Sequence, residues 1–101
     1  MSLIREEQNL FVVDLHYIVP LEDIEPFIDP HLAFLDEHYA SGCFIVSGAK
    51  VPRTGGVIIA TAESLTALER LLEADPFRKE KLAEYTITEF RPGRAAPQLK
   101  E

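Results

Sequence analysis

The chain of 101 residues has one cysteine, no tryptophan and no long apolar run. Because Cys43 stands alone, no disulfide bond can form within the chain, and its place in the apolar run CFIV favours a small buried group over a nucleophile. No stretch of about 18 apolar residues occurs, so no membrane span is predicted. The N-terminal residues MSLIREEQN also lack the basic-then-apolar order of a signal peptide, and we therefore expect a cytoplasmic protein.

Basic residues are scarce as well. The chain has 17 acidic and 10 basic residues, which gives a formal net charge of −7. This charge argues against binding to a phosphate backbone or to an anionic lipid surface, so we expect neither a nucleic acid nor a membrane partner. Glycine is also infrequent: Gly55-Gly56 is a turn signal, and no glycine-rich phosphate loop marks a nucleotide or flavin site. We therefore expect no cofactor.

Four segments have the pattern of β-strands. In residues 10–18 every second side chain faces the same side, and residues 83–90 alternate in the same way. Residues 43–48 and 57–62 are short and mostly apolar, which is typical of strands with both faces partly buried. The connection between these two segments is too short for a crossover, so we expect them to form an antiparallel hairpin.

A helical region is predicted between the first two strands. Pro30 interrupts its pattern, so we expect a short helix to about Ile28 and then a second helix with Asp29 as N-cap, Pro30 in the first position and Gly42 after its end. Apolar residues spaced three and four apart define one face of this region: Leu21, Ile24, Ile28, Leu32, Leu35 and Tyr39.

A second helical region lies before the last strand. Ser64 is its expected N-cap, and Asp75-Pro76 is expected to open a further short helical turn. The inner face of the first helix in this region is predicted to consist of Leu65, Leu68, Leu71 and Leu72. Across the whole chain we predict a core that contains Leu15, Leu32, Leu35, Ile45, Ile59, Leu68 and Leu72.

The element order strand, helix, strand, strand, helix, strand is the ferredoxin-like βαββαβ pattern of the α+β class. Right-handed crossovers place both helices on one face of a four-stranded antiparallel sheet. One domain is expected over residues 1–101, with its core at about 10–92 and a C-terminal tail at 93–101 that is either mobile or docked on a partner. The other sheet face keeps apolar residues without a third layer, so we predict a homodimer packed sheet to sheet.

Two residues at helix starts have the chemistry of an acid–base site, and each also has a simpler interpretation. His31 is three residues after Ile28 and four before Leu35, so its imidazole is expected to face the sheet. It is either a core-edge histidine with one hydrogen-bond partner or a group controlled by a nearby carboxylate. Asp75 is either an ordinary N-cap or a cap that also orients an imidazole. Asp29 is expected to be only a cap.

Other candidate sites are weaker. Asp14 and His16 share one face of the first strand, where an acid–base pair can form, but in this fold that face meets the partner subunit. We therefore interpret them as polar groups of an interface. His38 is expected near the end of its helix. His31 with Asp75 could hold a metal ion, but two ligands without a third make a poor zinc site, so no metal is expected.

Short motifs recur along the chain in a definite order: HLAFL at 31–35, SGA at 47–49, the ES-x-x-x-L start from Glu63, ADPF at 74–77 and EFRPG after the last alternating segment. In this order and spacing they resemble the YciI-like (YCII-related) proteins of the dimeric α+β barrel superfamily. The resemblance covers about residues 10–92. It implies a ferredoxin-like fold, a homodimer formed through the sheets and a small pocket between the sheet and the helices.

The resemblance also implies a site. The His–Asp pair of the family falls on His31 and Asp75, and Ser47, Gly48 and Phe77 lie in the motifs expected at the pocket, where they would bind a small-molecule ligand. Family members often have a proline after the glycine of the second strand, where this chain has SGA. Some members are associated with the degradation of halogenated aromatic compounds, and most have no assigned activity.

Three hypotheses for function follow. In the first, the chain is a small-molecule enzyme in which His31 is the general acid or base and Asp75 orients it, for an elimination, an isomerisation or a dehydrohalogenation-type reaction. In the second, the pair only anchors a ligand in a non-catalytic binding or accessory protein. In the third, both residues are purely structural. The distance between the two side chains, and a cavity beside them, are the geometric tests.

Overall fold

The computed structural model describes residue 4 and residues 7–99 of the chain. Its strands lie close to their predicted bounds, and short helical turns flank the two longer helices. In chain order the elements are β1 (Leu10–Tyr17), α1 (Leu21–Ile24), the 3-10 turn η1 (Glu25–Phe27), α2 (Ile28–Ser41), β2 (Phe44–Ala49), β3 (Gly55–Thr61), α3 (Leu65–Leu72), α4 (Pro76–Lys79), β4 (Ala83–Phe90) and the 3-10 turn η2 (Pro97–Leu99).

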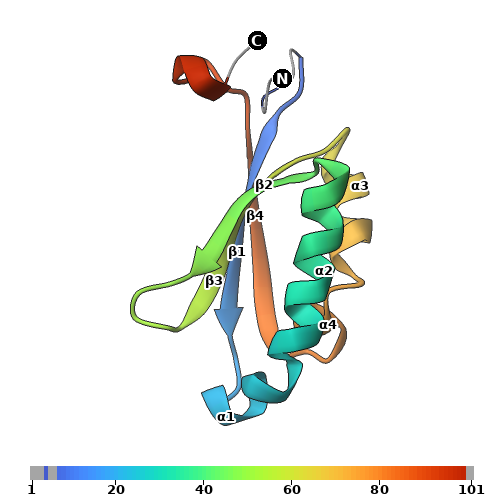
Figure 1. Cartoon of the computed structure of the whole chain (residues 1–101), viewed down its shortest axis with the longest axis vertical. Coiled ribbons are helices and arrows are strands. Elements are labelled where there is room, and N and C mark those ends of the chain that lie inside the picture. The colour runs from blue at the N-terminus through green and yellow to red at the C-terminus, as the bar shows by residue number, and fades with distance from the viewer. Residues whose placement is uncertain (1–3, 5–6, 100–101) are drawn as a thin grey trace.

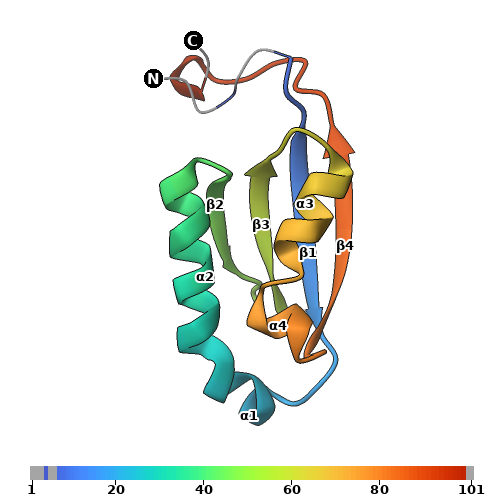
Figure 2. The ribbon, with the colours of Figure 1, turned by 90° about the vertical axis from the view of Figure 1, so that its right-hand side faces the viewer.

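The strands form one antiparallel sheet in the order β2-β3-β1-β4. In the centre, Val13 of β1 lies opposite Ile58 of β3 on one side and Ile87 of β4 on the other. Figure 1 shows the sheet nearly edge-on, with α2, α3 and α4 on the same side of it. Figure 2 shows α2 on the β2 side of that face, and α3 and α4 on the side of β1 and β4. The predicted ferredoxin-like α+β fold is confirmed.

The core lies between the sheet and the helices. Phe11, Val13 and Leu15 of β1 point towards the helices and are at most 2 % exposed, as the period of two predicts. The remaining strands, the helices and the segment before β4 contribute the other buried residues of this cluster: Ile24, Phe34, Leu35, Phe44, Ile58, Ala60, Leu68, Leu72, Phe77, Leu82 and Ala83.

Three predicted core residues are not fully buried. Leu32 is 48 % exposed, and Ile45 and Ile59 are only partly buried. Ile59 lies opposite Val12, on the sheet face that no helix covers, and Ile45 lies at an irregularity in the pairing of β2 with β3. The remaining members of the predicted core are buried: Leu15, Leu35, Leu68 and Leu72.

The start of α2 differs from the prediction. The helix begins at Ile28 with Phe27 as its N-cap, so Asp29 is not the cap but the second residue of the helix. Pro30 is the third residue, where proline is tolerated because the first four N–H groups of a helix have no partner within it. At the other end Gly42 has φ 86°, and this left-handed conformation ends the helix as predicted.

The buried stripe of α2 is also rotated relative to the predicted face. Phe34 and Leu35 are its buried residues, whereas Leu32 and Tyr39 on the predicted face are 48 % and 37 % exposed. The ring of Phe34 packs edge-on against Phe44 of β2, with centroids 5.9 Å apart. This aromatic contact places the Phe34 side of the helix on the sheet and leaves Leu32 at the edge of the layer.

Helices α3 and α4 begin where the sequence predicts. Ser64 is the N-cap of α3 and accepts a hydrogen bond from a first-turn N–H at 3.0 Å, and Asp75 is the N-cap of α4. Leu68 and Leu72 are buried beneath α3. The prediction that Leu65 belongs to the same inner face is wrong, because Leu65 is 37 % exposed at the start of the helix.

The connection between β2 and β3 approaches β1 closely. A Cβ atom on Gly55 would lie 1.8 Å from the carbonyl oxygen of Leu15, so only glycine fits there. The N–H of Lys50 donates to the Gly55 carbonyl at 2.9 Å, and the N–H of Tyr17 donates to the Thr54 carbonyl at 2.9 Å. These bonds fix the connection to the end of the sheet.

At the far end of the sheet the N–H of Ile4 donates to the carbonyl of Leu99 at 3.0 Å, so part of the predicted tail forms the turn η2 beside the N-terminal segment. Residues 100 and 101 of that tail lie outside the described residues. Whether the tail docks on a partner stays a prediction. Within residue 4 and residues 7–99, no helix has the length and apolar character needed to cross a membrane.

Candidate active site

Asp75 lies at the turn between α3 and α4. Its N–H donates to the carbonyl of Leu72 at 3.0 Å, and this bond turns the chain at the end of α3. Pro76 then takes the first position of α4, and Oδ1 of Asp75 accepts a hydrogen bond from the N–H of Phe77 at 3.1 Å. The Asp75 side chain is fully buried. The cap therefore holds a carboxylate inside the protein in a fixed direction.

The imidazole of His31 binds the same carboxylate oxygen. Nδ1 of His31 lies 2.8 Å from Oδ1 of Asp75, so the two residues that the family resemblance implies as a pair are in hydrogen-bond contact. Because a carboxylate only accepts hydrogen bonds, the proton of this bond is on Nδ1. Nε2 has no hydrogen-bond partner among the described residues, and the His31 side chain is 13 % exposed. The pair thus presents one unoccupied imidazole nitrogen.

Tyr85 of β4 binds the second oxygen of Asp75, a role that was not predicted from the sequence. Its hydroxyl donates to Oδ2 of Asp75 at 2.5 Å. Burial, the charge of Asp75 and this hydrogen bond all raise the pKa of Tyr85 above its ordinary value of 10.0. The phenol therefore remains a hydrogen-bond donor. The alternation of side chains along β4 could have indicated this role, because it places Tyr85 on the helix-facing side of the sheet, opposite Leu15.

Aromatic rings hold the imidazole from one side. The ring of Phe77 stacks on His31 with centroids 3.9 Å apart and planes inclined by 10°. Tyr17 of β1 packs edge-on against the same phenylalanine, with centroids 5.9 Å apart. Phe77 is buried, and it was predicted as a substrate-binding residue. The stacking fixes the plane of the His31 ring, while Asp75 fixes its rotation in that plane.

A cavity of about 220 Å³ adjoins His31. It lies between α2, α4 and the strands β1, β2 and β3, and Phe77 forms part of its wall. Ser47 and Gly48, the other predicted substrate-binding residues, line it from β2. Leu32 lines it from α2, so the residue that is missing from the core contributes instead to a cavity. The structure therefore brings all five predicted site residues together: His31, Asp75, Ser47, Gly48 and Phe77.

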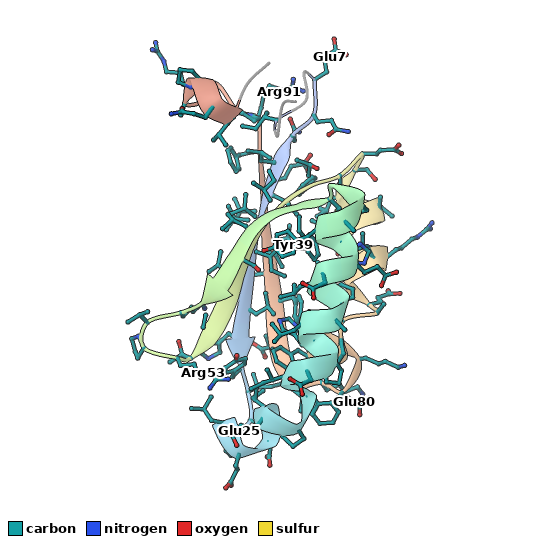
Figure 3. The ribbon with its side chains drawn as sticks, viewed as in Figure 1. Glu7, Glu25, Tyr39, Arg53, Glu80 and Arg91 are labelled. Atoms are coloured by element: carbon teal, nitrogen blue, oxygen red, sulfur yellow. The ribbon has the colours of Figure 1, made fainter. Side chains whose placement is uncertain are left out.

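Ser47 has a partner at the cavity edge. Its Oγ lies 2.5 Å from the hydroxyl of Tyr39, which comes from the last turns of α2. Either oxygen can be the donor. This bond ties β2 to α2 beside the cavity and gives Ser47 a fixed position. Figure 3 shows Tyr39 between the helix and the sheet.

The weaker candidates lie elsewhere. Asp14 pairs with Lys50 at 2.9 Å on the uncovered sheet face, and His16 is exposed on the same face. The ring of His38 packs against Phe34, with centroids 4.7 Å apart. Sγ of Cys43 donates to the Thr61 carbonyl, and burial raises the pKa of this thiol. In the part of the chain that the structure describes, no three His, Cys, Asp or Glu side chains are grouped as a metal site would require.

Comparison with known proteins places the chain in a family. The family model of the YCII-related domain matches residues 10–91. The chain belongs to the YCII-related family. No curated protein matches the sequence of this YCII-related protein. Its fold is similar to that of 5-chloro-2-hydroxyhydroquinone dehydrochlorinase from Burkholderia phenoliruptrix AC1100, solved in complex with 2,5-dihydroxybenzoquinone. The two chains are 24 % identical, with a TM-score of 0.72 over 83 % of this chain and 95 % of that one.

Proposed function

We propose that this YCII-related protein is a small-molecule enzyme that uses the His31–Asp75 pair for acid–base chemistry. One observation carries the proposal: Nδ1 of His31 is bound to a buried carboxylate, while the ring lines a cavity and its Nε2 has no partner among the described residues. A histidine held in this way can take a proton from a substrate and return it. A histidine with a purely structural role would need neither the cavity nor the free nitrogen.

The reaction that fits this pair is an elimination or an isomerisation. In an elimination, Nε2 of His31 takes a proton from the substrate, the electron pair left behind forms a new π bond, and the leaving group departs as an anion with its own electron pair. In an isomerisation the same proton is returned to a different atom. In both cases Asp75 stabilises the imidazolium that forms. Neither reaction needs an oxidant or a covalent nucleophile.

The solved relative supports this class of reaction. It is a dehydrochlorinase, and its bound ligand is a small quinone with one ring. Dehydrochlorination is an elimination in which hydrogen and chloride leave the substrate. The cavity beside His31 is also small, at about 220 Å³. We therefore propose a dehydrohalogenation-type elimination on a single-ring compound as the first reaction to test.

The test is chloride release from 5-chloro-2-hydroxyhydroquinone, kept reduced under argon. We expect His31→Gln to lower kcat/KM by about 10²- to 10⁴-fold, because the general acid or base is lost. Asp75→Asn should also lower kcat/KM, while it retains an N-cap of similar quality. His38→Gln is the matched control, since His38 is on the same helix and packs against Phe34 and Phe44. It should keep the parent rate.

Equal rates for the parent protein and His31→Gln would contradict the proposed chemistry. The alternative is a non-catalytic small-ligand-binding or accessory protein. Asp75 accepts hydrogen bonds from three donors, which are His31, the N–H of Phe77 and the hydroxyl of Tyr85, and a pair fixed in this way suits a ligand anchor as well. Saturable binding of 2,5-dihydroxybenzoquinone, without turnover of any chlorinated hydroquinone in a panel, would favour this alternative.

We also propose that the protein is a homodimer, formed through the sheet face that no helix covers. Val46 of β2 and Phe90 of β4 are 55 % and 41 % exposed, and both belong to this face. Val12 and Ile59 lie between them and are only partly buried. Side chains of this type gather where a second subunit buries them.

Light scattering tests the dimer. The parent protein should have about twice the chain mass at micromolar concentration. Val46→Asp places a charge on the sheet face and should shift the protein towards the monomer. Val51→Asp introduces the same charge in the β2–β3 connection, where Val51 is 98 % exposed, and should leave the mass unchanged. A monomeric parent protein would contradict the proposal.

A further inference from the structure

The cavity beside His31 differs in charge from the rest of the chain. The chain has a net charge of −7, yet no Asp or Glu is among the described residues that line this cavity. Asp75 lies behind the imidazole and is fully buried. Arg53 is the one lining residue, within the same described set, that carries a permanent charge. Figure 3 shows Arg53 below the end of β1 and above α1, at the end of the sheet.

Arg53 is held at this end by the backbone. The N–H of the next residue, Thr54, donates a hydrogen bond to the Pro52 carbonyl at 2.8 Å. The Thr54 carbonyl accepts a hydrogen bond from the N–H of Tyr17 at 2.9 Å. No side-chain hydrogen bond or ion pair of Arg53 is formed among the described residues, although acidic residues outnumber basic ones by 17 to 10. Lys50, by contrast, is paired with Asp14. The guanidinium of Arg53 is therefore available to an anion from solution.

The other walls limit the size and shape of that anion. The cavity has a volume of about 220 Å³, and an apolar cavity of about 150 Å³ is enough for one benzene molecule. Leu15, Leu35 and Ile58 supply apolar wall, and His31 and Phe77 supply aromatic wall. A flat ring with one or two substituents fits this space, whereas a nucleotide or a long chain does not.

We infer that the ligand of this cavity is a single-ring compound with an oxyanion, either a carboxylate or an ionised hydroxyl, that Arg53 binds. His31 then faces the ring with its free nitrogen. The inference rests on the proposed function for the cavity, and it adds the chemical class of the substrate. Arg53 contributes by charge and by its planar fork of N–H donors, both of which match an oxyanion.

The experiment compares two probes of the same shape. Benzoate and benzamide are titrated into the ¹⁵N-labelled full chain at about pH 8, where an ordinary imidazole is neutral. The amide peaks of Gly48 and Gly56, both of which line the cavity, report binding there. We expect benzoate to bind about tenfold more tightly than benzamide. In Arg53→Gln the two probes should bind equally. Titration of 2,5-dihydroxybenzoquinone distinguishes the ionised-hydroxyl ligand from the carboxylate.

Arg70→Gln is the matched control, because it removes the same charge from the exposed side of α3. It should keep the preference for benzoate. Four results would each overturn the inference. They are equal binding of benzoate and benzamide by the parent protein, a benzoate preference that survives in Arg53→Gln, a preference lost equally in Arg70→Gln, and binding of neither benzoate nor 2,5-dihydroxybenzoquinone up to their solubility limits. Binding needs no turnover, so a failed chloride-release assay would reject the proposed reaction and leave this result unchanged.

Discussion

The chain contains two Asp-Pro pairs, and the structure uses them differently. Asp29-Pro30 lies within the first turn of α2, where Asp29 is exposed and its side chain has no hydrogen bond among the described residues. Asp75-Pro76 starts α4, where Asp75 is fully buried and its two oxygens accept three hydrogen bonds. The same dipeptide therefore marks a helix start in both places, but only one of the two carboxylates belongs to a candidate site.

The difference arises from the neighbouring elements. Around Asp75, α4 packs between α2 and β4. His31 of α2 and Tyr85 of β4 therefore both reach the carboxylate of the cap. Around Asp29 no second layer faces the side chain, which points to the exposed side of α2. A local sequence pattern thus fixes the backbone geometry of a cap, while tertiary packing decides whether the cap also has a chemical role.

The largest expected effect is that of Asp75→Ala on stability. The substitution leaves His31, the N–H of Phe77 and the hydroxyl of Tyr85 without their acceptor in a buried site. Breaking a buried network of this kind costs about 3–5 kcal/mol of the free energy of unfolding. Urea unfolding of the parent protein and the variant measures the difference. A loss of only about 1 kcal/mol, the value for an ordinary cap, would make Asp75 equivalent to other helix starts.

Tyr85→Phe tests one arm of the same network. It removes the donor to Oδ2 of Asp75 and leaves a buried carboxylate oxygen without that bond, at a cost of about 1–3 kcal/mol. Tyr39→Phe is the control, because it removes a hydroxyl from an exposed hydrogen bond with Ser47 and should cost less than about 1 kcal/mol. Equal losses for both variants would show that the bond to Asp75 is no stronger than a surface contact.

Tyr85→Phe should also change how the free energy of unfolding depends on pH in the alkaline range. Because the pKa of Tyr85 is raised in the folded protein, its contribution is fully present below the unfolded value of about 10 and is lost as the pH rises above it. The free energy of unfolding of the parent protein should then fall more steeply above about pH 10 than that of Tyr85→Phe. Urea unfolding at a series of alkaline pH values gives both slopes, and parallel curves would exclude this effect of burial.

Sequence patterns predicted the parts of the fold that depend on local rules. The period of two located β1 and β4, and single residues with one preferred role, Ser64 and Gly42, marked helix ends where the structure has them. The predicted start of α2 was wrong. Proline is tolerated throughout the first turn of a helix, so the pair Asp29-Pro30 does not show which position of that turn Pro30 occupies.

The rest of the site depended on contacts between distant elements. The rotation of α2 is set by Phe34 on Phe44, so spacing alone could not show that Leu32 faces a cavity. Tyr85 is only ten residues from Asp75, but its role appears when α4 folds onto β4. His31 and Asp75 could be paired in advance because family resemblance supplied the long-range link that neither cap pattern contains.

Ser64→Ala should lower the free energy of unfolding by less than Asp75→Ala does. It serves as a reference for an N-cap with no further role. Ser64 starts α3, is exposed, and makes one bond to the helix backbone at 3.0 Å. Removing that bond should cost about 1 kcal/mol. Thermal or urea unfolding measures it, and chloride release should stay at the parent rate. A cost close to that of Asp75→Ala would mean that burial and the two side-chain donors add nothing to the cap of α4.

The smallest effect is expected from Asp29→Asn. Asp29 is not the cap of α2, and its exposed side chain interacts with the helix only through its charge near the N-terminus. The substitution should therefore change the free energy of unfolding by less than about 0.5 kcal/mol and leave chloride release unchanged. Asp75→Asn makes the identical chemical change in the other Asp-Pro pair, where a charge that orients His31 is removed. Measured side by side, the two variants differ only in tertiary surroundings. If Asp29→Asn and Asp75→Asn changed chloride release by the same amount, the two helix starts would not differ in function.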